Sequence, residues 1–183
     1  SRGLGDVYKR QPLKQAICAP EGYVILDSDS SQIEARTLAW LAEQEDLVQA
    51  FDRGEDVYRL MASSIYNKDP EDVTKDERFV GKTTILGSGY GMGAAKFQRQ
   101  LQNFGVTVTL EEAKQIIATY RDTYTTIPSL WKKASDVLNW IANNNYGEFG
   151  RDNLLKVEGK KGIRLPNGLY LKYPNLRKQK NEE

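Results

Sequence analysis

Two groups of residues in this sequence combine side-chain types and spacing that could support chemistry. In the first, the carboxylates Asp27 and Asp29 follow a short apolar run, Tyr23–Leu26, that is typical of a buried strand. Because side chains two residues apart on a strand point to the same face, both carboxylates could meet one divalent cation, which prefers oxygen ligands. The alternative is that Asp29 or Ser30 serves only in the turn and cap of the helix that follows.

The second group lies on a helix predicted over residues 75–90. Arg78 and Lys82 are four residues apart and therefore share one helix face, which Leu86 continues by another turn. Glycines within this helix are unfavourable by about 1 kcal/mol each, but they let a large group approach the backbone closely. Two cations followed by an apolar residue and Tyr90 match a nucleotide from its phosphates to its base. The alternative is a solvated basic stripe that ends in glycines.

The composition restricts the chemistry that is available. The 183 residues contain no histidine and one cysteine, Cys18, which excludes an intrachain disulfide, a His/Cys zinc site and any nucleophile activated by histidine. A metal ion must therefore bind to carboxylates, which favours magnesium or manganese. With 39% hydrophobic and 28% charged residues, the chain is predicted to form one globular domain or two small ones. No apolar run approaches the roughly 18 residues of a membrane span, so we expect no membrane partner.

Charge is distributed unevenly along the chain. Residues 12–77 carry 6 basic and 15 acidic side chains, whereas residues 78–134 carry 8 basic and 3 acidic ones. Residues 151–183 are again basic, with 9 basic and 4 acidic side chains. An acidic segment followed by basic segments could hold a cation beside a polyanion, and the alternative is a set of solvated faces of different sign.

The pattern of caps and apolar residues predicts a mostly helical α+β chain with one early strand and one late β-hairpin. Signals for helix starts stand at four places: the capping-box pairs Ser31/Glu34, Thr74/Glu77 and Thr109/Glu112, and the proline Pro128. A further helix is expected over residues 57–65. The hairpin is predicted from Asn167-Gly168, which lies between the apolar runs 163–165 and 169–171.

Two motifs resemble those of a known family. Residues 29–36 read DSSQIEAR, which resembles motif A of the family A DNA polymerases, D-Y-S-Q-I-E-x-R, of the bacterial polymerase I and phage type. Residues 78–91 match motif B of that family, R-x-x-x-K-x-x-x-F-G-x-x-Y-G, apart from a leucine at position 86. Both motifs stand in the family's order and spacing, and the resemblance extends from about Pro12 to Pro174.

The resemblance implies a palm domain that carries metal ions and a fingers domain that closes over the incoming deoxynucleotide. On that basis the chain divides into a non-native leader (1–11), part of a palm (12–45), fingers (46–145) and a palm-side hairpin and tail (146–183). Asp29 would bridge two magnesium ions, for which manganese could substitute, and the carbonyl of Ser30 would bind one of them. Arg78 and Lys82 would hold the triphosphate, with Lys82 near the α-phosphate and able to donate a proton to pyrophosphate.

The resemblance also implies roles for residues around the nucleotide. Glu34 would be the steric gate that rejects a ribose 2′-hydroxyl, Gln32 would line the same site, and Tyr90 would pack at the base end. Glu34 is also a capping-box residue, so two roles compete for its carboxylate. Tyr58 stands where bacterial relatives have a phosphate-binding histidine, and its hydroxyl can still donate a hydrogen bond. Leu86 replaces the family's phenylalanine or tyrosine, which predicts discrimination against dideoxynucleotides.

The family's motif C, a His-Asp-Glu hairpin with the second metal-binding aspartate, has no counterpart in these 183 residues, and neither has the thumb. The resemblance therefore implies a phage-like palm–fingers fragment of a DNA-directed DNA polymerase and predicts little or no catalysis by the fragment alone. The complete enzyme would use a DNA primer-template and deoxynucleoside triphosphates, in the cytoplasm of a bacterial cell or of a phage host. The sequence does not identify a processivity partner.

The alternative function belongs to another class of protein. The basic segments 78–134 and 151–183 would form the surface of a non-catalytic nucleic-acid-binding module that follows phosphates. Such a module would bind DNA in a salt-sensitive way that neither Asp29→Ala nor added deoxynucleotide would change.

Overall fold

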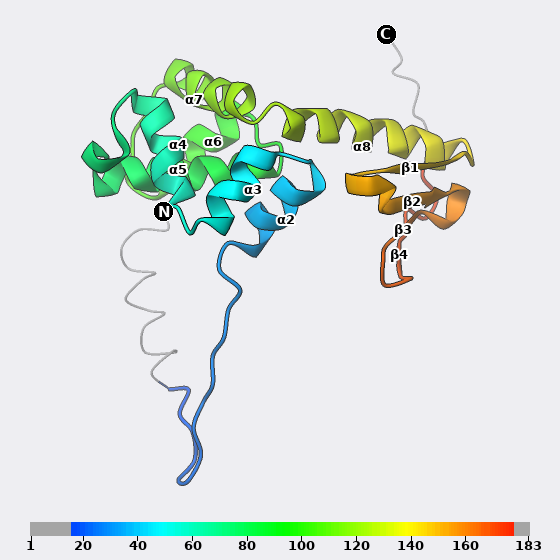
Figure 1. The fold of residues 1–183 in the computed structure, drawn as a ribbon, viewed down its shortest axis with the longest axis horizontal. Helices are drawn as coiled ribbons and strands as arrows, with labels where there is room; N and C mark the ends of the chain where they lie inside the picture. The colour runs from blue at the N-terminus through cyan, green and yellow to red at the C-terminus, as the bar shows by residue number, and fades with distance from the viewer. Residues whose placement is uncertain (1–15, 178–183) are drawn as a thin grey trace.

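The computed structural model describes residues 16–177, and the fold is α+β, as the sequence predicted (Figure 1). The helices are α2 (Ile33–Leu41), α3 (Glu45–Asp52), α4 (Val57–Tyr66), α5 (Lys75–Gly89), α6 (Ala94–Asn103), α7 (Leu110–Thr123) and α8 (Thr126–Ala142). The strands are β1 (Tyr146–Phe149), β2 (Leu155–Glu158), β3 (Ile163–Arg164) and β4 (Tyr170–Leu171), with short 3₁₀ turns η1 (Pro70–Asp72), η2 (Arg151–Asn153) and η3 (Gly159–Lys161). Helices α2–α7 form one cluster, and α8 leads from it to the sheet (Figure 1). The expected leader, 1–11, and the end of the expected tail, 178–183, lie outside the described residues.

Two predicted helix starts are confirmed by the hydrogen bonds of their caps. At α5, Thr74 Oγ1 accepts from the Glu77 N–H at 3.2 Å, and Glu77 Oε2 accepts from the Thr74 N–H at 2.9 Å. Thr109 and Glu112 make the same reciprocal pair at the start of α7. These bonds satisfy backbone donors that the first turn of a helix leaves without partners. The helix predicted to carry the two cations therefore begins at a defined residue.

The other helices agree with the sequence patterns less closely. α4 begins at Val57 as predicted, after an N-cap by Asp56, whereas α8 begins at Thr126, two residues before the predicted Pro128. Helices α3 and α6 were not predicted, because neither has a capping side chain bonded to its first turn. Within residues 16–177, no helix is both long enough and apolar enough to cross a membrane.

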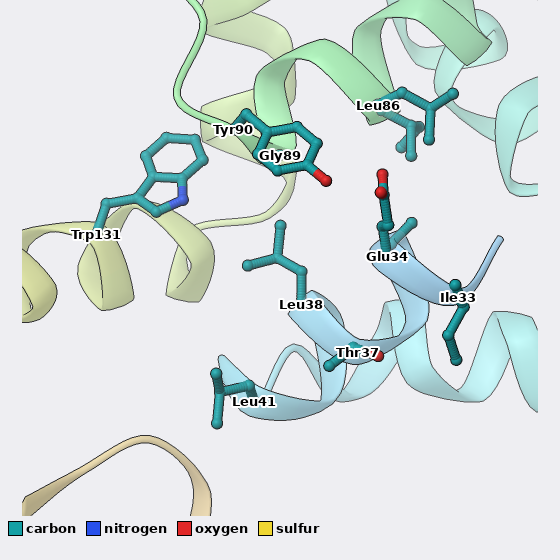
Figure 2. Close-up of a pocket in the computed structure, with 11 residues that line it drawn as sticks. Ile33, Glu34, Thr37, Leu38, Leu41, Leu86, Gly89, Tyr90 and Trp131 are labelled. Atoms are coloured by element: carbon teal, nitrogen blue, oxygen red, sulfur yellow. The ribbon is translucent and has the colours of Figure 1, made fainter. Parts of the chain in front are cut away.

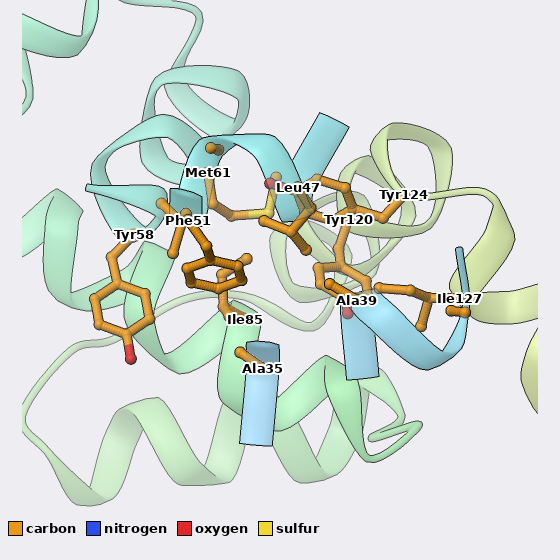
Figure 3. Close-up of a cluster of buried hydrophobic side chains, with 13 residues drawn as sticks. Ala35, Ala39, Leu47, Phe51, Tyr58, Met61, Ile85, Tyr120, Tyr124 and Ile127 are labelled. Carbon is orange, nitrogen blue, oxygen red and sulfur yellow. The ribbon is translucent and has the colours of Figure 1, made fainter. Parts of the chain in front are cut away.

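Two buried clusters hold the helical part together, and α5 belongs to both. The first lies between α2, α3, α4, α5 and the end of α7 (Figure 3), and its large members include Leu47, Phe51, Tyr58, Met61, Ile85, Tyr120, Tyr124 and Ile127. The second lies between α5, α6 and α7, and its members are Val80, Phe97, Leu101, Ala113, Ile116 and Ile117. Because Ile85 packs in the first cluster and Val80 in the second, α5 is held on two sides.

Helices α4 and α5 pack closely because Gly81 has no side chain. A Cβ atom at Gly81 would lie 2.1 Å from the Tyr58 carbonyl oxygen and 3.1 Å from the Ala62 Cβ. Any side chain at this position would therefore push the two helices apart. The close approach predicted from glycine is confirmed here, and the group that approaches is the backbone of α4.

The four strands of the described chain form an antiparallel sheet in the order β1-β2-β3-β4. A third buried cluster, which includes Val137 and Ile141 of α8, packs this sheet against α8. The predicted hairpin is confirmed, since Ile163 pairs with Leu171 across β3 and β4. Its loop turns at Gly168, whose φ of 81° is a conformation that suits glycine.

A second connection joins the sheet to the end of α2. Arg151 Nε donates to the Trp40 carbonyl at 2.7 Å, the guanidinium lies over the Trp40 ring, and a terminal nitrogen pairs with Glu45. Gly150 leaves room for Leu41 beside this contact, since a Cβ at Gly150 would lie 2.7 Å from Leu41 Cδ1. The sheet is therefore attached to the helical cluster through Arg151 as well as through α8.

The early strand predicted for Tyr23–Leu26 is wrong. Residues 16–32 contain turns but neither helix nor strand, and the four apolar side chains are exposed, 91% at Leu26. A strand is stable only beside a hydrogen-bonded neighbour, and no strand within residues 16–177 pairs with this segment. Without a pleated strand, the two-residue spacing does not place Asp27 and Asp29 on a common face.

The capping box predicted for Ser31 and Glu34 is also wrong. The N-cap of α2 is Gln32, which has a φ of 58° and makes no side-chain bond to the first turn. Ser31 instead offers its carbonyl oxygen to Arg36 Nε at 3.0 Å. The Glu34 carboxylate is therefore not used as a cap, and of the two competing roles only the one at the site is left to it.

Candidate functional site

The candidate site follows one face of α5. Residues four apart on a helix lie above one another, so Arg78, Lys82 and Leu86 form a row that continues to Tyr90 at the C-cap. At a rise of 1.5 Å per residue this row is about 18 Å long, enough to run beside an extended nucleotide. Lys82 and Tyr90 are exposed, and Arg78 and Leu86 are partly buried. The structure thus brings the predicted motif B residues together on one accessible face.

The cationic end of the row is held by the first turn of α4. Arg78 Nε donates to Asp56 Oδ2 at 2.5 Å. The Tyr58 ring lies beside both cations, with its centroid 5.4 Å from Arg78 Cζ and 6.0 Å from Lys82 Nζ. These distances are those of cation–π contacts, so one aromatic ring holds the two positive charges side by side.

Tyr58 also connects the cations to the start of α2. Burial raises the pKa of the Tyr58 hydroxyl, which therefore stays protonated at neutral pH, and a hydrogen bond joins it to the Gln32 side chain. The structure thus brings together Gln32, Tyr58, Arg78 and Lys82, which the sequence analysis assigned to one site. They come from three different helices or helix ends.

The other end of the row borders an apolar pocket of about 480 Å³ between α2, α5 and α8 (Figure 2). Leu86 and Tyr90 contribute to its wall from α5, Leu38 and Leu41 from α2, and Trp131 from α8. Of these only Leu86 and Tyr90 were predicted as site residues. The pocket is the right kind of surface for a flat apolar group such as a base or sugar face.

Glu34 and Tyr90 meet across this pocket. The Tyr90 hydroxyl donates a hydrogen bond to the Glu34 carboxylate, and this bond raises the pKa of Tyr90 (Figure 2). Since Tyr90 is 72% exposed and Glu34 lies on α2, the bond connects the two motif helices at the rim of the pocket. Glu34 is therefore positioned beside the residues that would surround a nucleotide.

The predicted metal ligands Asp29 and Ser30 lie in the exposed segment just before α2. Three residues separate Asp29 from Gln32, so their Cα atoms are at most about 11 Å apart, and Gln32 is bonded to Tyr58. The Asp29 carboxylate and the Ser30 carbonyl are oxygen donors of the kind that magnesium prefers. Within residues 16–177, however, no three His, Cys, Asp or Glu side chains lie together as a metal site. The magnesium site therefore stays a prediction.

Two residues of the site were missed by the sequence analysis. Asp56 carries a local signal, because it precedes a helix and caps it, but its ion pair with Arg78 joins residues 22 positions apart. Trp131 belongs to the apolar stripe of α8, and only the tertiary packing of α8 beside α2 turns it toward the pocket. In both cases the missing information is the distance between elements rather than the residue type.

A row of cations and apolar residues on one helix, beside a pocket, is a fold and a site of a nucleotide-handling type, and comparison with known proteins identifies the class. The family model described as DNA polymerase family A matches residues 7–146, more than half of the chain. The chain therefore belongs to DNA polymerase family A. This result confirms the family predicted from the two motifs.

Curated relatives match part of the chain. DNA polymerase I of Synechocystis sp. is 34% identical over 117 residues, which are 64% of this chain and 11% of that protein. DNA polymerase I of Pseudomonas aeruginosa is 39% identical over 89 residues, which are 49% of this chain and 10% of that protein. The thermostable DNA polymerase I of Thermus thermophilus is 35% identical over 114 residues, which are 62% of this chain and 13% of that protein. The chain thus spans only a small part of the length of these relatives.

A solved structure is also similar to this chain. It is the POL domain of Pol1 from M. smegmatis in complex with DNA primer-template and dNTP, with a TM-score of 0.51 and 29% sequence identity. The similarity covers 66% of this chain and 20% of that chain. The helical arrangement described above is therefore one that a polymerase domain uses.

Proposed function

We propose that the chain is the part of a DNA-directed DNA polymerase that receives the incoming deoxynucleoside triphosphate. The complete enzyme adds deoxynucleotides to the 3′ end of a primer on a DNA template. One observation carries this proposal: a single helix has two cations, Arg78 and Lys82, at one end and Tyr90 beside an apolar pocket at the other. Family membership supports it, and so does the similar M. smegmatis domain in complex with primer-template and dNTP.

The cationic end binds the phosphates. Arg78 offers its terminal nitrogens and Lys82 its exposed ammonium group, and two positive charges fixed on one helix stabilise charge that builds up on phosphate oxygens. Lys82 lies nearer the base end of the row, so it meets the α-phosphate and donates a proton to the departing pyrophosphate. The Tyr58 hydroxyl, which stays protonated, supplies a further donor in place of the histidine of bacterial relatives.

The apolar end selects the sugar and the base. Leu86 packs against the sugar, and Tyr90 packs at the base end near the templating position. Glu34, held by its bond to Tyr90, occupies the space that a ribose 2′-hydroxyl would need, and Gln32 lines the same region from the N-cap of α2. A deoxyribose therefore fits and a ribose meets a carboxylate.

Magnesium is the metal that this proposal includes, and manganese is the ion that could replace it. Asp29, through its carboxylate, and Ser30, through its carbonyl oxygen, hold it together with ligands from outside residues 16–177. A bound pair of such ions would stabilise the attacking and leaving oxygens of the transfer. The protein's own contribution is to hold these donors next to Gln32, and through it next to the triphosphate-binding end of α5.

The test of the proposed function is the effect of Lys82→Ala on nucleotide binding. We expect the variant to bind deoxyadenosine triphosphate with magnesium about tenfold more weakly or worse, because a hydrogen bond between charged groups is removed. Its affinity for a short DNA duplex should change less than twofold. Isothermal titration calorimetry measures the first affinity and fluorescence anisotropy the second.

Lys96→Ala is the matched control, because Lys96 is exposed on α6 and lies away from the row. It should leave triphosphate binding unchanged. Equal losses of triphosphate and DNA binding in Lys82→Ala would contradict the proposal and favour the nucleic-acid-binding module instead.

The structure gives that alternative module little free charge. Most basic residues of the sheet have acidic partners: Arg151 pairs with Glu45, Lys156 with Glu148, and both Lys161 and Arg164 with Glu158. A surface that tracks phosphates needs basic side chains that are not already neutralised. The proposal therefore rests on the nucleotide site and not on the basic segments.

Leu86 leads to a prediction about sugar discrimination in a complete polymerase that contains this chain. The wild-type enzyme should prefer deoxynucleotides to dideoxynucleotides, and Leu86→Tyr should reduce this preference about tenfold, because the tyrosine adds a hydroxyl near the sugar. Single-nucleotide incorporation with dTTP and ddTTP measures the ratio. Leu86→Phe, which lacks the hydroxyl, is the control, and equal incorporation of both nucleotides by the wild type would refute the prediction.

We further propose that the 183 residues alone do not catalyse extension. The described part of the chain offers one predicted metal carboxylate, Asp29, and no clustered partners for it. Template-directed extension of a primer by the purified chain with magnesium would overturn this point while leaving the proposed nucleotide site intact. The phage-like character of the complete enzyme and its work in the cytoplasm belong to the same proposal.

A further inference from the structure

The terminal nitrogens of Arg78 are open, and its Nε is not. Nε donates to Asp56 Oδ2 at 2.5 Å, and the face of the guanidinium lies against the Tyr58 ring. Within residues 16–177, Nη1 and Nη2 make no hydrogen bond, and the side chain is 38% exposed. The guanidinium is thus held by its base and one face, with two terminal NH₂ groups left for a ligand.

Asp56 holds Arg78 with one oxygen while the other caps α4. Oδ1 accepts from the Arg59 N–H at 3.2 Å, and Oδ2 accepts from Arg78 Nε. Partial burial opposes ionisation of this carboxyl, but the bonds from Arg78 and from the backbone of α4 outweigh it and lower its pKa. Asp56 is therefore a charged, doubly bonded anchor at neutral pH.

The distance between the two helices keeps this anchor in register. Gly81, one turn after Arg78, lets the Tyr58 backbone approach α5 directly. The first turn of α4 therefore delivers the Asp56 carboxylate and the Tyr58 ring to opposite parts of the same guanidinium. A long side chain that is already ordered loses less entropy when it binds a ligand.

We propose that Asp56 is a positioning residue for the triphosphate: it acts through Arg78, whose guanidinium it holds with the terminal nitrogens turned toward the terminal phosphates. This inference rests on the proposed function and names a residue that motifs A and B do not contain. Asp56 itself does not touch the nucleotide.

Asp56→Asn separates the two duties of this side chain. Asparagine is as good an N-cap as aspartate, so α4 keeps its start. It has a single acceptor oxygen, however, and cannot accept from Arg59 N–H and Arg78 Nε together. The variant should therefore fold with an unchanged circular dichroism spectrum and release the guanidinium of Arg78.

The test is a double-mutant cycle in the full 183-residue chain with Asp56→Asn, Arg78→Ala and both together. The probe is deoxyadenosine triphosphate with magnesium, and calorimetry gives the affinities. Removing a carboxylate also lessens repulsion of the triphosphate, but this effect is present with or without Arg78. Asp56→Asn should therefore bind about threefold to tenfold more weakly than wild type, and should cause no loss when position 78 is alanine.

Two further measurements distinguish the possible failures. Asp76→Asn makes the same charge change on an exposed residue of α5 and should not weaken binding. Without any nucleotide, the Arg78 Nε–H resonance should be protected from exchange in the wild type and in Asp76→Asn, and unprotected in Asp56→Asn. An equal effect of Asp56→Asn in both Arg78 backgrounds overturns the inference. If Lys82→Ala in the same assay leaves binding unchanged, the proposed function has failed instead.

Discussion

Substitution of Gly81 by alanine is expected to destabilise the chain by about 1–3 kcal/mol, the usual cost of overpacking. The new Cβ would lie 2.1 Å from the Tyr58 carbonyl oxygen and 3.0 Å from the Ala62 nitrogen, and neither backbone atom can rotate away. Alanine favours a helix by about 1 kcal/mol over glycine, which reduces the loss without cancelling it. Urea unfolding followed by circular dichroism measures the change in the free energy of unfolding.

The same substitution should weaken triphosphate binding, because α4 must move away from α5 and take Tyr58 with it. Gly93→Ala is the control, since Gly93 has an ordinary backbone conformation with no atom near its missing Cβ. That variant should stay within about 1 kcal/mol of wild type. An unchanged unfolding midpoint for Gly81→Ala would mean that α4 and α5 are farther apart than described.

Phe97→Ala should have the largest effect on stability, a loss of about 3–5 kcal/mol. Phe97 is fully buried in the second cluster, and one of its ring carbons comes within 4.0 Å of a Cβ placed at Gly87. It therefore supports the last turn of α5, which leads to Tyr90. Because small domains are stable by only about 5–15 kcal/mol, the variant should unfold at a much lower urea concentration.

Phe104→Ala removes the same atoms from a surface position and is the matched control. Its ring is 63% exposed and touches Phe79 edge to face, with centroids 5.3 Å apart. The expected loss is about 1 kcal/mol, the value of one such aromatic contact. Similar losses for the two phenylalanine variants would contradict the assignment of Phe97 to the core.

The elements that could be predicted are those whose signals are local. Thr74 and Glu77 are three residues apart, and their reciprocal bonds depend on that spacing alone, so the start of α5 is predictable. The hairpin at Gly168 is predictable for the same reason, because a short loop needs a residue that accepts positive φ. The row from Arg78 to Tyr90 follows from the helix period once the helix is known.

The parts that could not be predicted depend on distant partners. Tyr23–Leu26 has the composition of a buried strand, but composition does not supply the neighbouring strand that would bury it. Glu34 has the spacing of a capping residue and is instead bonded to Tyr90, 56 positions later in the chain. Asp56 is recognisable as a cap, whereas its bond to Arg78 exists only because Gly81 lets two helices meet.

The contact of Arg151 with Trp40 and Glu45 has a mechanical consequence for the molecule. It closes the chain between Glu45 and Arg151 into a ring, so the β-sheet is not a pendant at the end of a single lever. Fraying of α8 alone would leave the sheet tethered to α2, the helix that follows Asp29. Any swing of the sheet must therefore break the Arg151 tether or carry α2 along with it.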